Sequence, residues 1–287
     1  MVQDLLSRAF TLRTSTFRKY RAGLRYALSA ARDKASSDLT PRLADLFTAA
    51  LLELESAQPT CLKRSNKTSA GKLKACPEPM FQSILNELKK NSGKSAFASP
   101  TAAAALLLFR GGFRPQELWN ADIERIGPGA VSVQVENGKA TNGRALGETR
   151  RVSLELGEEE MALALSWTGH IAALEKRYKP EKAMDRLARY FTDAGQRALK
   201  RDKVPSFYTL RHQVAANMKS AGMTKAEVAA VLGHASDSTA GRHYARRVSG
   251  SGKSVVKPDA LKVRLVRETA KPYSEFRDKQ ARTIKPR

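Results

Sequence analysis

The sequence predicts a mainly α-helical protein with a small β-hairpin or sheet. Apolar residues recur at helical spacing through most of the chain, and residues that start helices precede several of these stretches. One region instead alternates apolar and polar residues on both sides of a turn-rich loop, which is typical of a hairpin. Hydrophobic residues fill 41% of the 287 positions, enough to build cores in about two domains.

Residues 1–55 predict a small helical N-terminal domain. Between Ser15 and about Asp33, apolar side chains fall at helical spacing with basic residues among them. A second helix is expected after Thr40, a capping residue, with Pro41 at the first helical position. The next segment, 56–78, lacks periodicity and is rich in lysine and arginine, which predicts a basic interdomain linker.

A second, mostly helical domain is predicted over residues 79–247. After two helices, alternating valines at 131–135 and the pair Val152 and Leu154 flank a turn-prone segment, which predicts a hairpin with a long basic tip. Further helices are expected at 158–178, 181–200, 209–220 and 224–232, with a short one before Tyr244. Residues 248–287 predict a basic tail in which 261–266 favours a strand.

The charge balance favours a polyanionic partner. The chain has 51 Lys and Arg against 28 Asp and Glu, a formal net charge of +23, which attracts nucleic acid, acidic proteins or anionic membrane surfaces. Its longest apolar run, residues 102–109, is well short of the roughly 18 to 20 residues that span a bilayer. No signal peptide pattern opens the chain, so a cytoplasmic protein without a membrane partner is expected.

The cysteines do not suggest a metal site. Cys61 and Cys76 are the two cysteines, and neither has a second cysteine or a histidine at the short spacing of a zinc site. Both are expected to be free thiols, with a bridge between them as the alternative. The usual nucleotide-binding motifs are absent from the sequence as well.

Three separated segments of the second domain together suggest phosphate chemistry. They are Gly111 to Leu118, Tyr208 to His212, and Leu232 to Tyr244. Each segment by itself is weak evidence, because an arginine near a helix start is usually a surface residue or an ion-pair partner. The signal lies in their order and spacing.

This order resembles the tyrosine recombinase family over about residues 79–247. The resemblance implies a helical DNA-binding domain followed by a catalytic domain in which Arg114 and Arg211 bind the scissile phosphate. It implies that Lys139 on the hairpin is the general acid, that His234 assists, and that Tyr244 attacks the phosphate to form a 3′-phosphotyrosine. Neither ATP, a metal nor another cofactor is implied. Glu117 matches a family glutamate, which we interpret as structural support.

The residue types suit this chemistry. Attack on a phosphodiester builds negative charge on the non-bridging oxygens, which planar guanidinium groups can clamp in a bidentate manner. A lysine desolvated among other cations could deliver a proton to the departing 5′ oxygen at neutral pH. A phenol with an ordinary pKa near 10 needs nearby cations or a base before it can attack. His234 could accept a hydrogen bond or a proton.

The chain departs from the family pattern at several positions. Tyr208 stands where the family has a histidine, and it can donate a hydrogen bond to phosphate but cannot carry a positive charge. Arg144 lies on the same hairpin as Lys139 and is the alternative general acid. The interval from His234 to Tyr244 is one residue longer than is commonest in the family, and His243 is an added neighbour. The N-terminal domain is shorter than the family's usual four helices.

Two other functions fit part of the sequence. Residues 223–244 are compatible with a helix-turn-helix that binds DNA without cutting it, although that leaves the arginines and Tyr244 unexplained as a set. A type IB topoisomerase would share the chemistry, and a recombinase with a failed active site would share the fold. For the recombinase, the expected partners are double-stranded DNA, three further copies of the chain in a homotetramer on two DNA sites, and accessory DNA-bending proteins.

Overall fold

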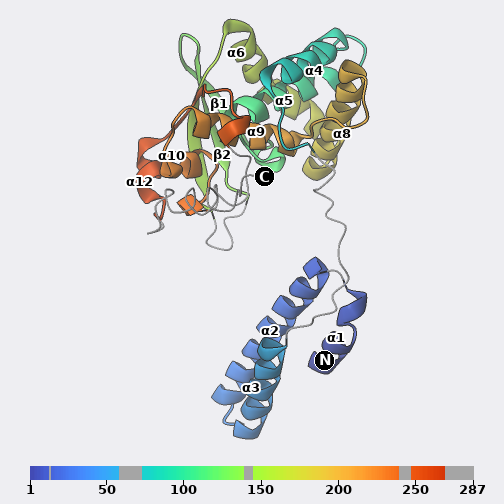
Figure 1. Cartoon of the computed structure of the whole chain (residues 1–287), viewed down its shortest axis with the longest axis vertical. Helices are drawn as coiled ribbons and strands as arrows, with labels where there is room; N and C mark the ends of the chain where they lie inside the picture. Colours follow the sequence, from blue (N-terminus) through green and yellow to red (C-terminus); the bar gives the residue numbers. More distant parts are fainter. Residues whose placement is uncertain (13, 58–72, 139–144, 239–246, 269–287) are drawn as a thin grey trace, which may run out of the picture. The chain divides into compact units, whose positions relative to one another are not determined.

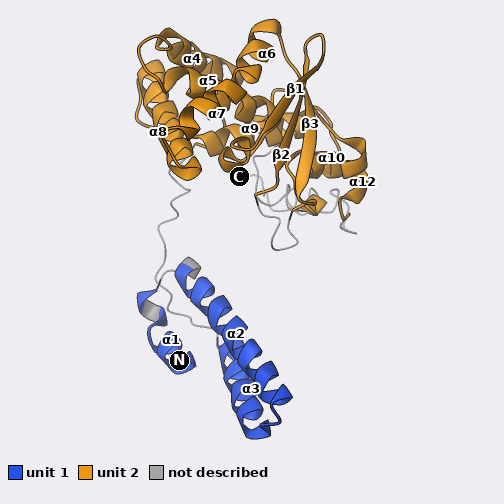
Figure 2. Cartoon of the chain, turned by 180° about the vertical axis from the view of Figure 1, so that it is seen from behind, with its two compact units in different colours: residues 1–71 blue, residues 72–287 orange. Residues whose placement is uncertain are grey.

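The structure is a computed structural model that describes residues 1–12, 14–57, 73–138, 145–238 and 247–268. The chain divides into two compact units, Met1–Gly71 and Lys72–Arg287 (Figure 2). Within the described ranges, no helix combines the length and apolar character needed to cross a membrane.

The first unit is helical, as the sequence predicts. It contains α1 (Val2–Ser7), a 3-10 turn (Ala9–Thr11), α2 (Thr14–Ser37) and α3 (Pro41–Ser56), with α2 and α3 packed along each other (Figure 1). Thr40 precedes α3, but its hydroxyl donates to the Ala35 carbonyl at 2.9 Å and does not cap the helix. The small core joins all three helices through Val2, Leu5, Phe17, Leu28, Leu51 and Leu54.

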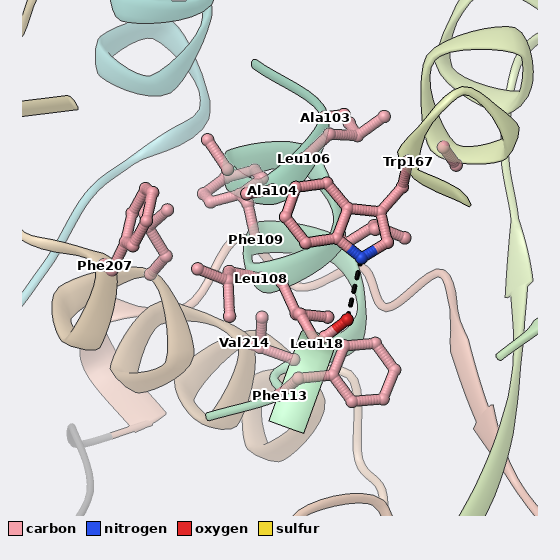
Figure 3. Close-up of a cluster of buried hydrophobic side chains, with 14 of the residues drawn as sticks. Ala103, Ala104, Leu106, Leu108, Phe109, Phe113, Leu118, Trp167, Phe207 and Val214 are labelled. Atoms are coloured by element: carbon pink, nitrogen blue, oxygen red, sulfur yellow. Dashed lines mark hydrogen bonds between the residues drawn. The ribbon is translucent and has the colours of Figure 1, made fainter. Parts of the chain in front are cut away.

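The second unit is built around a buried helix, α5 (Ala98–Gly111). Nearly every α5 residue is buried, because α4 (Glu78–Lys90), α6 (Glu158–Leu165), α7 (Trp167–Glu175), α8 (Pro180–Leu199) and α9 (Phe207–Ser220) surround it. Figure 3 shows the resulting core, in which the Trp167 ring N–H donates to the Leu118 carbonyl at 2.8 Å. The single helix predicted over 158–178 is divided at Ser166, whose hydroxyl bonds back to the Leu163 carbonyl and so competes with the regular helical pattern.

A four-stranded antiparallel sheet lies beside these helices (Figure 1). The strands follow the order β1 (Asp122–Gly127), β2 (Ala130–Glu136), β3 (Thr149–Glu155) and β4 (Val256–Pro258). The predicted hairpin is β2 and β3, in which Val133 pairs with Val152 and Val135 with Arg150. The two outer strands could not be predicted from the sequence, because β1 has no buried residue and β4 has three residues.

The segment after β4 corrects one prediction. Residues 261–266 were expected to form a strand, but Ala260–Leu265 form the helix α12. Asp259 starts this helix by accepting a hydrogen bond from the Leu261 backbone N–H at 2.8 Å, and such capping outweighs the alternating pattern. Helix α12 packs against α10 (Lys225–Val231).

Two side chains of helix α9 form hydrogen bonds with segments that were predicted to belong to the linker and the tail. The Gln213 side chain accepts from the Cys76 backbone N–H at 2.9 Å and donates to the Ser249 carbonyl at 2.7 Å. Thr209 donates to the Leu73 carbonyl at 3.0 Å. Cys76 is a free thiol whose burial raises its pKa to about 12, whereas Cys61 lies outside the described residues.

Candidate active site

The candidate site begins where α5 ends. Gly112 terminates the helix in the left-handed conformation, with φ of 68°, and its N–H donates to the Leu108 carbonyl. A side chain at this position would place a Cβ 3.1 Å from Val214, so both the turn and the packing require glycine. The chain then reverses into a short 3-10 helix, Pro115–Leu118, directly preceded by Arg114.

A buried carboxylate, Glu117, is the centre of the site. Its Oε2 accepts from the Arg114 backbone N–H at 2.7 Å and from Arg150 Nη2 at 2.6 Å. Its Oε1 accepts from Arg114 Nη1 at 2.5 Å and from the Gly138 backbone N–H at 3.2 Å. Glu117 therefore supports the site structurally, as the sequence analysis interprets it, and holds Arg114 by both backbone and side chain.

Arg211 reaches the same carboxylate from α9. Its side chain is fully buried, and its Nη1 lies 3.9 Å from Glu117 Oε2. Two backbone carbonyls hold the guanidinium group, because Nη1 donates to Gly112 at 2.5 Å and Nη2 donates to Leu232 at 2.7 Å. The ends of α5 and α10 thus fix the orientation of this arginine.

His234 completes the cluster. Its Nε2 lies 3.3 Å from Arg211 Nη2, and the residue is almost completely buried. Burial, with Arg211, Arg114 and Arg150 nearby, lowers the pKa of His234 to about 2. The imidazole is therefore neutral at physiological pH and can serve as a hydrogen-bonding group there.

The base of the hairpin is attached to this cluster. Asn137 Nδ2 donates to the carbonyls of Leu146 at 3.2 Å and Gly147 at 2.9 Å, which closes the hairpin on both sides of its tip. Ala145 forms a bridge with His234, and Gly138 bonds to Glu117. Both described ends of the tip therefore contact residues of the cluster.

Arg150 is the site residue that the sequence analysis missed. It lies on β3 with its side chain fully buried, bonded to Glu117 and to Asn137 Oδ1. A signal was present, because Arg150 shares the inward phase of β3 with Val152 and Leu154, whereas Arg151 is exposed. An arginine on the apolar face of a strand needs a buried partner.

The charges of the site stabilise one another. Burial would raise the pKa of the Glu117 carboxyl, but Arg150, Arg211 and Arg114 hold that pKa well below its ordinary range. The carboxylate therefore stays ionised, and three guanidinium groups surround it. In the described parts of the chain, no group of three or more His, Cys, Asp or Glu side chains could hold a metal ion.

Three of the six predicted site residues meet in this cluster: Arg114, Arg211 and His234. Tyr208 lies one turn before Arg211 on α9, and 45% of its surface is exposed. Lys139 and Tyr244 lie outside the described residues, as do their rivals, which are Arg144 and His243.

Comparison with known proteins identifies the family. Residues 78–249, more than half of the chain, match the sequence profile of the phage integrase family. The chain belongs to this family, whose members are tyrosine recombinases, and the family predicted from the sequence is confirmed. No curated protein matches the chain.

Several solved structures of recombinases are similar at low identity. A lambda integrase dimer bound to a COC′ core site is 13% identical with a TM-score of 0.45, and the match covers 85% of this chain and 77% of that one. XerH bound to its difH substrate is 15% identical with a TM-score of 0.38, covering 75% and 65%. XerA recombinase is 16% identical with a TM-score of 0.40 and full coverage of both chains.

Proposed function

We propose that this protein is a site-specific DNA recombinase that cuts and rejoins DNA through a 3′-phosphotyrosine on Tyr244. One observation carries the proposal: Arg114, Arg211 and His234 come from three separated segments and meet around one buried carboxylate. A site built only for stability would not need to concentrate three buried guanidinium groups around a single carboxylate, because an unbalanced buried charge is costly. Membership of the phage integrase family supports the same function.

In the proposed reaction, Arg114 and Arg211 bind the non-bridging oxygens of the scissile phosphate. Negative charge develops there as the Tyr244 oxygen attacks, and fixed guanidinium groups stabilise it without reorganising. The Tyr244 hydroxyl loses its proton to water as its oxygen forms a bond to phosphorus, and the bond from phosphorus to the 5′ oxygen breaks. The bond energy is conserved in the phosphotyrosine, so the reverse attack by a 5′ hydroxyl rejoins the strand.

Lys139 is the proposed general acid, which gives a proton to the departing 5′ oxygen. The neighbouring Gly138 N–H bonds to Glu117, and Ala145 on the far side of the tip pairs with His234. These contacts support a hairpin tip that acts at the arginine cluster. The neutral His234 accepts from Arg211 at Nε2 and carries its proton on Nδ1, so it is suited to act as a hydrogen-bond donor. Tyr208 stands in the position of the family histidine.

The N-terminal unit is proposed to bind DNA through α2. Arg18 and Lys19 on this helix are exposed. Arg21 and Arg25 are less available, because Arg21 bonds to the Glu55 carbonyl at 2.8 Å and Arg25 pairs with the Glu55 carboxylate at 3.0 Å. By family resemblance, four copies of the chain act on two DNA sites, with accessory DNA-bending proteins where the target requires them.

The helix-turn-helix alternative is less well supported. Helix α10 has seven residues, and Val228 to Val231 are buried. The second helix of a helix-turn-helix is the recognition helix, so α10 would be only the first helix of the motif, and the hypothesis leaves the buried cluster of Arg114, Arg211 and Glu117 without a role.

The decisive experiment is covalent trapping on a nicked suicide substrate that carries the cognate site. Wild type is expected to form an adduct that resists denaturation without metal or ATP, and Tyr244→Phe should bind the site but form none. His243→Ala and Tyr208→Phe are the matched controls and should retain adduct. Mass spectrometry of the trapped peptide should locate the nucleotide on Tyr244.

Other results would point to other functions. An adduct that persists in Tyr244→Phe would refute the assigned nucleophile. Specific DNA binding by wild type without any covalent adduct would favour the helix-turn-helix hypothesis or a recombinase with a failed active site. Relaxation of a supercoiled plasmid that lacks a partner site would favour a topoisomerase.

A further inference from the structure

Arg150 adds a third buried positive charge beside Glu117, where Arg114 and Arg211 already lie. Its side chain is fully buried on β3, with the guanidinium carbon 5.5 Å from the centroid of the Phe113 ring. Nη2 donates to Glu117 and Nη1 donates to Asn137, while Nε has no hydrogen-bond partner among the residues that the structure describes. Burying a guanidinium group is costly even when it is paired.

The position of Arg150 bears on the charge available to the other arginines. Arg150 Nη2 lies 2.6 Å from Glu117 Oε2, and Arg211 Nη1 lies 3.9 Å from the same oxygen. Arg150 therefore occupies the carboxylate oxygen that would otherwise attract Arg211. Arg150 also offsets the negative charge of Glu117. Without Arg150, that charge would cancel the field of one of the two arginines that are proposed to bind phosphate.

We propose that Arg150 is a positioning residue that engages Glu117 so that Arg114 and Arg211 keep their positive charge for the scissile phosphate. This inference rests on the proposed function, because it assumes that those two arginines bind the phosphate. Glu117 is needed to orient Arg114, and Arg150 removes the electrostatic penalty of placing a carboxylate next to a phosphate.

A second set of contacts holds the Arg150 side chain in place beside Glu117. Asn137 accepts from Arg150 and donates to the carbonyls of Leu146 and Gly147, which close the hairpin. Gly233 fits against this pair, since a Cβ there would lie 2.7 Å from Arg150 Nη1. Arg150 thus connects the base of the hairpin with the residue that precedes His234.

The test is a double-mutant cycle on the suicide substrate. Arg150→Met keeps a long side chain and removes the charge, and it should slow single-turnover cleavage on the order of tenfold to a hundredfold, the range for coupled neighbouring groups. Binding of the uncleaved site should change less than the cleavage rate. Arg150→Lys should recover part of the rate, and Arg151→Met, an exposed neighbour on the same strand, is the matched control and should cleave normally.

The decisive comparison is made in the Glu117→Gln background. Without the carboxylate there is no charge for Arg150 to offset, so Glu117→Gln and the double variant Glu117→Gln/Arg150→Met should cleave within a few-fold of each other. Thermal unfolding of each variant shows which ones are folded. The comparison does not need the single Arg150→Met variant, which could fail to fold because it leaves Glu117 with fewer partners.

The outcomes separate the two proposals. A folded double variant that cleaves far more slowly than Glu117→Gln would overturn the role of Arg150 in offsetting Glu117, and so would a folded Arg150→Met variant with the wild-type rate. Absence of an adduct from wild type would instead refute the proposed function, together with the inference that rests on it.

Discussion

The Nη2 atom of Arg211 lies 3.3 Å from Nε2 of His234. A guanidinium group has no acceptor, so the imidazole accepts the hydrogen bond at Nε2 and carries its proton on Nδ1. Protonation of Nε2 would place two positive groups in contact. His234 is therefore held neutral by its neighbour as well as by burial, in keeping with its lowered pKa.

The first prediction concerns stability in mild acid. Burial and three arginines lower the pKa of His234 from 6.5 to about 2, so below pH 6.5 the unfolded chain binds a proton that the folded chain does not. Stability should consequently fall as the pH falls, by up to about 1.4 kcal/mol per pH unit for this one group. Urea unfolding of wild type and His234→Gln between pH 4.5 and 7 measures the effect.

The comparison isolates His234 from the other histidines. His170 and His212 also have lowered pKa values, chiefly through burial, and they contribute equally to both proteins. The variant should therefore lose stability less steeply with falling pH than wild type. Equal slopes would show that His234 is not held neutral in the folded chain.

The second prediction assigns the general acid. Lys139→Ala should slow cleavage by about 10² to 10⁴ while binding is nearly unchanged, because proton transfer is needed only in the transition state. A substrate with sulfur in place of the scissile 5′ oxygen barely needs protonation and should restore the rate. If sulfur restores Arg144→Ala but not Lys139→Ala, the acid is Arg144 or another hairpin residue.

The third prediction concerns the salt dependence of DNA binding. Each phosphate neutralised contributes about 0.9 to the slope of log affinity against log salt, so Arg18→Ala should reduce the slope by about that amount. Arg25→Ala is the matched control on the same helix, and it should have a smaller effect because Arg25 pairs with Glu55. Equal effects of the two variants, or no dependence on salt, would argue against DNA binding by the exposed side of α2.

The fourth prediction tests the turn that presents Arg114. Gly112→Ala should destabilise the protein by about 1 to 2 kcal/mol, because alanine is unfavourable in the left-handed conformation, and its Cβ would crowd Val214. Cleavage should also slow, because the Gly112 carbonyl holds Arg211. Gly169→Ala in α7, where a Cβ meets nothing within 4 Å, should be neutral or stabilising. Urea unfolding of both variants checks this contrast.

The sequence predicts those elements whose pattern agrees with their packing. The valines of β2 alternate because one face of that strand is buried, and the hairpin follows from them. Apolar and basic residues also alternate over 261–265, yet this segment forms a helix, which Asp259 caps. Leu261 and Leu265 are exposed there, so the alternating pattern does not correspond to a buried strand face. Periodicity predicts a strand only where an apolar face is actually covered.

For the candidate site, the structure shows which residues lie together, and their catalytic roles stay predictions. Arg114, Arg211 and His234 are recognisable from their order along the chain, and the structure brings them together. Arg150 was not predicted as a site residue, because its role depends on an ion pair with Glu117, which lies 33 residues away in the sequence. Contacts between distant charges follow from the three-dimensional fold, which spacing along the sequence does not specify.

The two edge strands of the sheet, β4 and β1, differ in length and charge. β4, which has three residues, pairs with β3 through residues 256–258 and forms one edge of the sheet, and within the described residues the other edge is that of β1. That edge carries the exposed charges of Asp122, Glu124 and Arg125, and its register shifts before Gly127. Charged side chains and irregular pairing discourage edge-to-edge association of sheets. A three-residue strand at one edge and exposed charges at the other therefore both oppose aggregation through strand pairing.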